Sequence, residues 1–280
     1  MFDIQFNSND YDPENLPELF GMRKQFIAYL DIVGFEEKVN KGNASVDLKL
    51  LYSINDIINH SKEIIPIIKN TDKEIKMKVF SDNFLFCTEN DYFALLGLVS
   101  LLQSSFIECD LFIRGSLYYG ELTYNDDFVY GKGLLEAYKI ENEISIFPRV
   151  IIDDTFFSGA HEEINKLSPR ELSYEEFLES LNDYYCTDFD TNKYINYLGI
   201  MENYFIDGQM KYNFRELLQN HAANIRIGLK SESKRVLQKY QWCRNYHNEI
   251  CKKYQYNDLQ IEYPLQNGII DMENECQQLP

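Results

Sequence analysis

The sequence lacks the cysteine and histidine patterns of a zinc protein. Its six cysteines include no CxxC pair and its four histidines show no HExxH spacing, so we expect no zinc site. No stretch approaches the ~18 consecutive apolar residues that span a bilayer. The first residues are polar and acidic, unlike the basic and apolar start of a signal peptide. We therefore expect a cytoplasmic protein with free thiols, away from membranes.

Positive charge is also scarce. The 280 residues include 27 Lys and Arg against 45 Asp and Glu, a net charge of −18. This excess argues against a general nucleic-acid binder, because a phosphate backbone would repel it. It does not exclude a single nucleotide, since a small anion responds to the local site and to any metal bound there. Most of the net negative charge lies in residues 121–207, where 6 basic and 19 acidic residues give 6 − 19 = −13.

Apolar residues are plentiful, at 45% hydrophobic and 15% aromatic, so the chain can bury a core. The patterns predict strands over Phe26–Val33, Glu74–Phe80, Phe84–Thr88, Leu111–Thr123 and Arg149–Asp153, and helices over Ser45–Asn70, Tyr92–Phe106 and Gly131–Ile146. This order departs from the strict alternation of a Rossmann fold. We predict an α+β fold of the ferredoxin-like, split βαβ kind, with an antiparallel central sheet.

We divide the chain into an N-terminal arm (1–22), a domain (23–150) and a C-terminal, largely helical extension (151–280). Within the extension, residues 211–253 carry ten basic and three acidic residues. A heptad-like seam runs through Val236, Tyr240, Cys243, His247, Ile250 and Tyr254. We expect His247 to be a core or interface residue rather than a ligand. The seam fits packing in a dimer and packing within one chain equally well, and the sequence predicts no role for the extension.

Two acidic residues stand out by their positions. Asp31 lies near the end of the first predicted strand, and Asp82 lies in the polar turn Ser81–Asn83 of a predicted hairpin. In a split βαβ sheet the strand end and the hairpin lie side by side, so the two carboxylates could share divalent cations with a triphosphate. Taken singly, each has a plainer interpretation, as a helix cap or a turn residue.

Four segments in order resemble the class III nucleotidyl cyclases over about residues 24–147, under half of the chain. They are AYLDIVGFEEKV (28–39), KMKVFSDNFLF (76–86), LFIRGSLYYGEL (111–122) and VYGKGLLEAYKIE (129–141). Each motif alone is weak, but four in order are fairly specific. The chain is most similar to the bacterial pyrimidine cyclases of the Pycsar antiphage system, which make cyclic UMP or cyclic CMP.

The resemblance implies roles for individual residues. It implies two Mn²⁺ or Mg²⁺ ions held by Asp31, Asp82 and the carbonyl of Ile32. Phosphates would lie on the turn formed by Val33, Gly34 and Phe35. Lys78 matches the position that reads the base in adenylate cyclases, and Lys139 matches the arginine that stabilises transition-state charge. Arg114 would support the site electrostatically, and Tyr138 would approach the nucleotide, although core packing is its plainer role.

Two positions depart from the family pattern. The asparagine that orients the ribose is Leu135 here, and the arginine is Lys139, which lacks the bidentate fork. Both departures fit a pyrimidine nucleotide cyclase, and they also fit a catalytically silent nucleotide-binding module. Lys78 keeps a purine cyclase possible. The related enzymes that make cyclic dinucleotides carry a GGDEF or GGEEF signature, which this sequence lacks.

The resemblance therefore implies a uridylate cyclase that converts UTP to 3′,5′-cyclic UMP and pyrophosphate. The lysine at the base-reading position is a hydrogen-bond donor and suits the carbonyl of uracil; a cytidylate cyclase acting on CTP is the alternative. The family also implies a homodimer with active sites at its interface, where Lys139 would serve the site of the other chain. In antiphage defence, the cyclic nucleotide would reach a separate effector.

Overall fold

The computed structural model describes residues 21–36, 40, 52, 55–56, 59, 75–125, 128–168, 170–206 and 213–262. The predicted arm lies almost entirely outside the described residues, as does most of the predicted helix Ser45–Asn70. Within the described part of the chain, no helix is long and apolar enough to cross a membrane.

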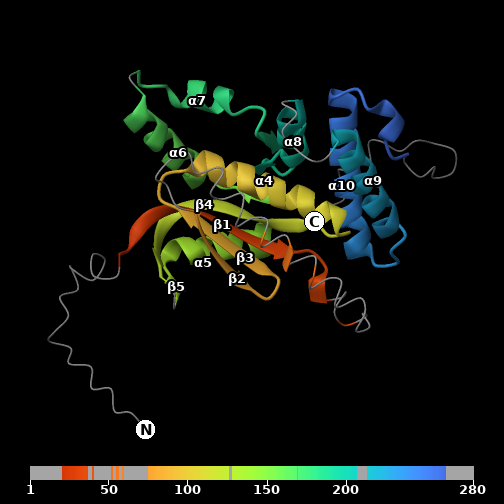
Figure 1. The fold of residues 1–280 in the computed structure, drawn as a ribbon, viewed down its shortest axis with the longest axis horizontal. Helices are drawn as coiled ribbons and strands as arrows, with labels where there is room; N and C mark the ends of the chain where they lie inside the picture. Colours follow the sequence, from red (N-terminus) through yellow and green to blue (C-terminus); the bar gives the residue numbers. More distant parts are fainter. Residues whose placement is uncertain are drawn as a thin grey trace, which may run out of the picture.

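The described strands form one sheet in the order β2-β3-β1-β4-β6-β8-β7, with β5 paired to β4 (Figure 1). The strands are β1 (Arg23–Ile32), β2 (Lys76–Phe80), β3 (Asn83–Thr88), β4 (Ile113–Tyr124), β5 (Val129–Tyr130), β6 (Val150–Ile152), β7 (Tyr185–Thr187) and β8 (Lys193–Ile195). Strand β1 pairs antiparallel with both β3 and β4, and β2 pairs antiparallel with β3. This order confirms the predicted α+β fold, its split βαβ arrangement and its antiparallel central sheet.

The two faces of the sheet are covered by different helices. Alternate residues of β1, such as Phe26 and Leu30, are buried beneath α4 (Tyr92–Glu108), while Ile27 packs with Ala137 of α5 (Lys132–Lys139) on the other face. Figure 1 shows α4 above the sheet and α5 below it. The helix predicted over Gly131–Ile146 is shorter than expected, because its α-helical part ends at Lys139. It continues as one π-helical turn, Ile140–Ile144, in which Ser145 N donates to Ile140 O over 2.9 Å.

The C-terminal region is helical, as predicted, but it also extends the sheet. Its helices are α6 (Asp154–Leu167), α7 (Tyr174–Ser180), α8 (Tyr197–Ile206), α9 (Phe214–Gly228) and α10 (Lys234–Lys253), followed by the short η2 (Asn257–Leu259). Strand β6 runs parallel to β4, and β8 and β7 follow it. The sequence did not predict β7 or β8, because each spans only three residues in an acid-rich segment with weak periodicity.

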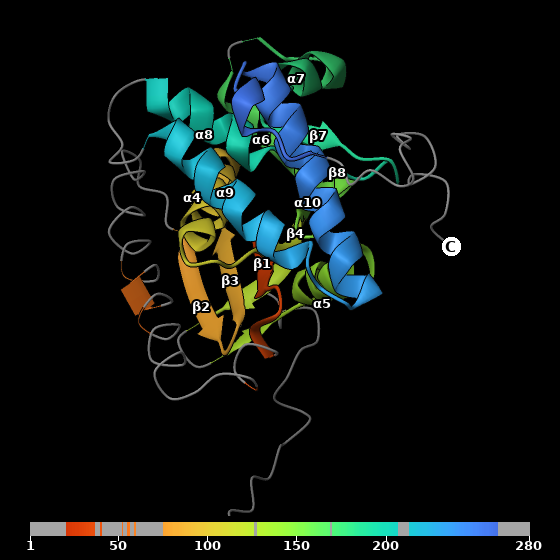
Figure 2. The same ribbon diagram turned by 90° about the vertical axis from the view of Figure 1, so that its right-hand side faces the viewer.

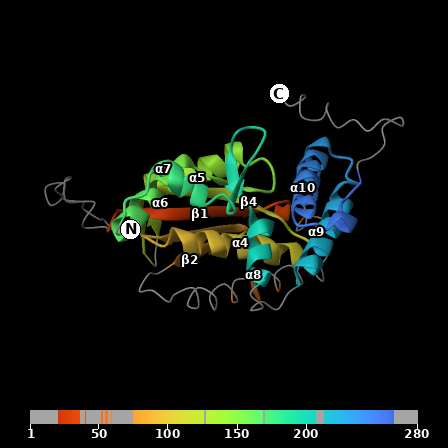
Figure 3. The same ribbon diagram turned by 90° about the horizontal axis from the view of Figure 1, so that it is seen from above.

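Helices α9 and α10 lie together at one end of the sheet (Figures 2 and 3). The predicted seam packs within the chain, because Cys243, His247 and Ile250 are all buried.

His247 is a core residue, as expected. Its Nδ1 lies 3.0 Å from Nδ1 of His221, whose Nε2 lies 2.8 Å from the Tyr197 hydroxyl. His247 Nε2 lies 3.0 Å from the carbonyl of Leu259, so that nitrogen carries the proton. If both rings are neutral, each contact in this chain pairs one hydrogen-bond donor with one acceptor.

This histidine pair predicts acid-sensitive stability. Burial lowers the pKa of His221 well below its usual range and also lowers the pKa of His247. The neutral histidines therefore contribute their whole stabilising free energy above pH about 6.5, the pKa of histidine in the unfolded chain. That contribution is lost as the pH falls towards the lower pKa values of the folded protein. The expected loss is up to about 1.4 kcal/mol per pH unit for each histidine. Urea unfolding at pH 7, 6 and 5 measures it. The double variant His221→Gln, His247→Gln should show a shallower slope, and an unchanged slope would contradict the assignment.

Candidate active site

The structure brings Asp31 and Asp82 to the same edge of the sheet. Asp31 is the second-last residue of β1, and Asp82 lies in the tight turn between β2 and β3. The backbone N–H of Ile32 donates to the carbonyl of Asp82 over 3.2 Å, which joins the strand end to the turn. Asp31 also lies opposite Asn83 on β3 and opposite Arg114 on β4. The split βαβ topology therefore produces the adjacency that the sequence predicted.

Arg114 is the central cation of this site. Its Nε donates to Oδ2 of Asp31 over 2.9 Å, and its Nη2 lies 2.6 Å from Oε1 of Glu141. Its Nη1 lies within reach of two carbonyls, 3.5 Å from that of Glu141 and 3.3 Å from that of Ser145. The π-helical turn presents these groups, since Glu141 lies within it and Ser145 directly follows it. Arg114 thus finds the partners that a charged side chain on an apolar strand requires.

The acidic side chains around Arg114 affect one another. Burial raises the pKa of Asp31; Arg114 opposes that rise, and the charge of Asp82 adds to it. Burial likewise raises the pKa of Glu141 to about 6, with Arg114 again opposing and with Asp31 and Asp82 contributing. Three carboxylates therefore share one partly desolvated region with excess negative charge. Such a region favours added positive charge.

The residues at this edge fit divalent cations of the Mg²⁺ or Mn²⁺ kind. Asp31, Asp82 and the carbonyl of Ile32 provide oxygen donors only, as these ions prefer, and the mutual repulsion of the acids would be relieved. In the described part of the chain, no three or more His, Cys, Asp and Glu side chains are grouped so as to hold a metal ion. The protein would therefore supply a minority of the ligands, and water or phosphate oxygens the remainder.

The turn after β1 differs in one respect from the expectation. The amide of Val33 donates to the carbonyl of Phe112 over 2.8 Å, so it is not free to bind phosphate as the sequence suggested. Gly34 follows with a φ of +76°, a left-handed conformation that glycine adopts at no steric cost. Phe35 then begins a helical turn. The phosphate-binding role predicted for this turn consequently depends on Gly34 and Phe35.

The two predicted lysines have partners other than the Asp31–Arg114 ion pair. Lys139 Nζ pairs with Glu136 over 3.1 Å on the exposed side of α5. Lys78 is on β2, where its Nζ lies 3.4 Å from the carbonyl of Asn125 and 5.7 Å from the ring centre of Tyr124. The roles predicted for both lysines stay predictions.

Tyr138 packs its exposed ring edge-on against Tyr29, with ring centres 5.8 Å apart. Burial raises the pKa of Tyr29 to about 12, and Glu141, Tyr138, Asp31 and Asp82 add to the rise. The tyrosine pair therefore lies beside the acidic side chains.

Three residues of the site carried no sequence prediction. Tyr29 lies two residues before Asp31 and hence on the same face of β1, which strand alternation alone implies. Glu141 ends the fourth cyclase-like segment, but nothing in the sequence predicts the π-helical turn that directs it to Arg114. Lys239 of α10 interacts electrostatically with both Asp31 and Glu141. It lies too far along the chain for any local pattern to have placed it there.

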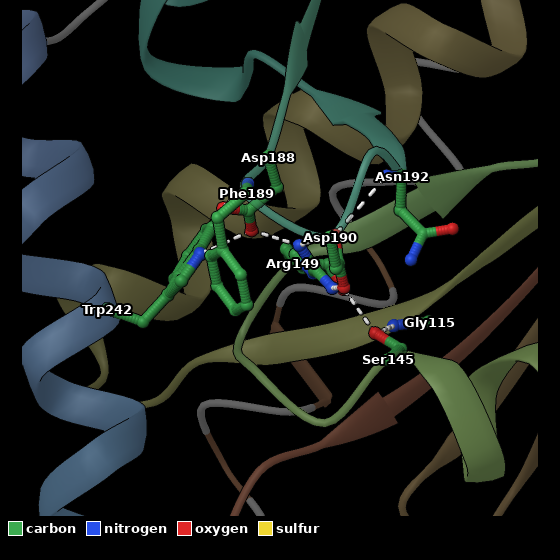
Figure 4. A network of polar contacts seen from close by, with 8 residues as sticks. All are labelled: Gly115, Ser145, Arg149, Asp188, Phe189, Asp190, Asn192 and Trp242. Carbon is green, nitrogen blue, oxygen red and sulfur yellow. Dashed lines mark hydrogen bonds and ion pairs between the residues drawn. The ribbon is translucent and has the colours of Figure 1, made fainter. Parts of the chain in front are cut away.

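A second polar network joins the site to the C-terminal region (Figure 4). The buried Arg149 guanidinium pairs with both Asp188 and Asp190, and Trp242 of α10 donates to Asp188 over 2.6 Å. The carbonyl of Arg149 accepts from the hydroxyl of Ser145 over 2.6 Å. Since the carbonyl of Ser145 faces Arg114, this network connects α10 and the β7–β8 hairpin to the site.

No protein-family model and no curated protein matches the chain, but solved structures do. The adenylyl cyclase CyaB from P. aeruginosa is 17% identical, with a TM-score of 0.40, over 50% of this chain and 82% of its own. A class III adenylyl cyclase-like ATP-binding protein from Pseudomonas aeruginosa is 16% identical, with a TM-score of 0.37, over 57% and 40%. A bacterial light-regulated adenylyl cyclase is 12% identical, with a TM-score of 0.42, over 78% and 58%. The match spans less than two thirds of the last two chains.

Proposed function

We propose that the protein is a nucleotidyl cyclase that forms a 3′,5′-cyclic nucleotide and pyrophosphate from a nucleoside triphosphate. The observation that carries this proposal is the junction of Asp31 and Asp82, joined through the 3.2 Å hydrogen bond from Ile32 N to Asp82 O. In the reaction the proton of the 3′-hydroxyl passes to solvent water, and the hydroxyl oxygen bonds to the α-phosphorus. The bond from that phosphorus to the oxygen bridging the α- and β-phosphates breaks, and pyrophosphate leaves.

The chain's own residues position the reactants rather than react with them. Arg114 holds the carboxylate of Asp31 at 2.9 Å, which fixes its direction at the end of β1. Asp82 is fixed through the backbone of the hairpin turn. When bound there, two Mn²⁺ or Mg²⁺ ions would lower the pKa of the attacking hydroxyl and neutralise charge on the leaving group. No serine or cysteine nucleophile is required, because the attacking group belongs to the substrate.

UTP is the substrate we propose, with cyclic UMP as the product. Lys78 supplies a donor suited to the carbonyl of uracil, while Leu135 and Lys139 depart from the pattern of purine cyclases. CTP is the nearest alternative, because uracil and cytosine differ at one edge where an amine replaces a carbonyl.

A rival function is nucleotide binding without turnover, as a catalytically silent module. Leu135 favours this rival, because the side chain that replaces the ribose-orienting asparagine cannot donate a hydrogen bond.

The test is incubation of the protein with Mn²⁺ and each of the four ribonucleoside triphosphates, followed by detection of pyrophosphate and cyclic product. We expect UTP to be turned over at least about tenfold faster than the others, as a site that hydrogen-bonds one functional group discriminates against its absence. Preferential turnover of CTP would instead identify a cytidylate cyclase. Binding without any cyclic product or pyrophosphate would identify the silent module.

We further propose that two copies form the active unit, with Lys139 of each acting at the site of the other. Three large apolar side chains are exposed on and next to α5, namely Tyr130, Leu135 and Tyr138. They support this proposal, because exposed apolar side chains close together in the chain fit an interface. In the same scheme the cyclic nucleotide acts as a cytoplasmic signal in antiphage defence, and a separate effector binds it.

A further inference from the structure

Helix α10 turns one stripe of side chains towards the protein interior. Along it, Trp242, Cys243, Tyr246 and Ile250 are at most 7% exposed. Lys239 precedes Cys243 by four residues and Tyr246 by seven, so it lies on the same stripe, one turn nearer the start of the helix. Its side chain is half-buried. The inward face of α10 therefore carries a lysine among its apolar residues.

The beginning of α10 lies at the candidate active site. Tyr240, which follows Lys239, packs edge-on against Phe112 with ring centres 5.7 Å apart, and the carbonyl of Phe112 accepts the hydrogen bond from Val33. Figures 1 and 3 show α10 at the end of the sheet towards which β1 runs. The Lys239 ammonium accordingly interacts with Asp31 and Glu141. Helix α10 thus brings a cation to the acidic side chains that surround Arg114.

The other cations near the site already have partners. Arg114 contacts Asp31, Glu141 and two carbonyls, Lys139 pairs with Glu136, and Lys78 lies against the carbonyl of Asn125. Lys239 Nζ, by contrast, makes neither a hydrogen bond nor an ion pair to any residue that the structure describes. A half-buried ammonium without an acceptor is costly, and an anionic ligand would supply that acceptor.

We propose that Lys239 binds the phosphate groups of the substrate and of the leaving pyrophosphate. The proposal rests on the proposed function, since it assigns the triphosphate end of the same site. Lys239 approaches from the Asp31 end of β1, where the phosphates and their cations belong, and not from β2, where Lys78 would read the base. The C-terminal region thereby gains a part in substrate binding.

The test measures pyrophosphate binding, which needs no turnover. Lys239→Met removes the charge but keeps an unbranched side chain. We expect its affinity for inorganic pyrophosphate in the presence of Mn²⁺, measured by titration calorimetry, to be at least about tenfold weaker than that of wild type, as for loss of one hydrogen bond to a charged group. Lys239→Arg should retain most of the affinity. Lys252→Met, an exposed position at the far end of the same helix, is the matched control and should bind as wild type.

A purely structural role predicts a different result. If Lys239 only balances Asp31 and Glu141, the Met variant will unfold at a changed temperature but will bind pyrophosphate within about twofold of wild type, which would overturn the proposal. Lys239→Gln provides the same comparison if the Met variant does not fold. If pyrophosphate binding depends on Lys239 but no cyclic product forms, the proposed cyclase activity is refuted and the role of Lys239 in binding phosphate stands. Cyclic product formed with unchanged KM in the variant would refute the role of Lys239 alone. A wild-type protein that binds no pyrophosphate would overturn the proposal outright.

Discussion

Replacing Asp82 with asparagine should lower cyclic nucleotide formation at least about a hundredfold, because the variant loses a carboxylate that would hold the catalytic cations. The fold should be nearly unaffected. The Asp82 side chain lies in a turn and accepts a hydrogen bond from Asn83 over 3.2 Å, which an amide oxygen can also accept. The measurement is the initial rate of cyclic product formation together with the unfolding free energy from urea titration.

The matched control is Glu121→Gln, which makes the same charge change at an exposed position near the other end of β4. It should keep full activity. Asp31→Asn should lose activity like the Asp82 variant, but it should also lower stability, since it weakens the ion pair with Arg114. Equal activity of the Asp82 variant and wild type would refute the assignment of Asp82 as a metal ligand.

Arg149→Met should have the largest effect on stability, a loss of about 3 to 5 kcal/mol in unfolding free energy. The guanidinium is fully buried and pairs with Asp188 and Asp190. It also lies 5.3 Å from the ring centre of Phe147. Its removal leaves two carboxylates and a cage of aromatic rings without their cation. Arg149→Lys should recover only part of the loss, because an ammonium cannot form the bidentate fork.

An exposed ion pair supplies the control for Arg149. Arg215 pairs with Asp258, and their side chains are 43% and 58% exposed, so Arg215→Met should cost less than about 1 kcal/mol. Urea or guanidinium denaturation compares the two variants directly. Similar costs for both would mean that the buried network contributes little, contrary to the prediction.

The sequence predicted the central sheet because its strands alternate or run apolar between clear turns, as in β1 and β4. It also predicted that Asp31 and Asp82 would be neighbours, since topology alone determines which strand ends meet. Strands β7 and β8 escaped prediction because three residues form no recognisable pattern. The orientation of Glu141 depends on a change from α- to π-helical hydrogen bonding, and the position of Lys239 depends on how α10 packs. Neither is encoded in local spacing.

The Arg149 network also constrains the order in which the protein can fold during its synthesis. Arg149 leaves the ribosome about 40 residues before Asp188 and Asp190, and well before Trp242 of α10. Until those partners exist, burying the guanidinium would leave an uncompensated charge in the interior. Strand β6 is therefore expected to dock fully beside β4 only after the β7–β8 hairpin has emerged. The nascent chain would then hold its first strands with an open edge and complete the sheet late, in a single cooperative step.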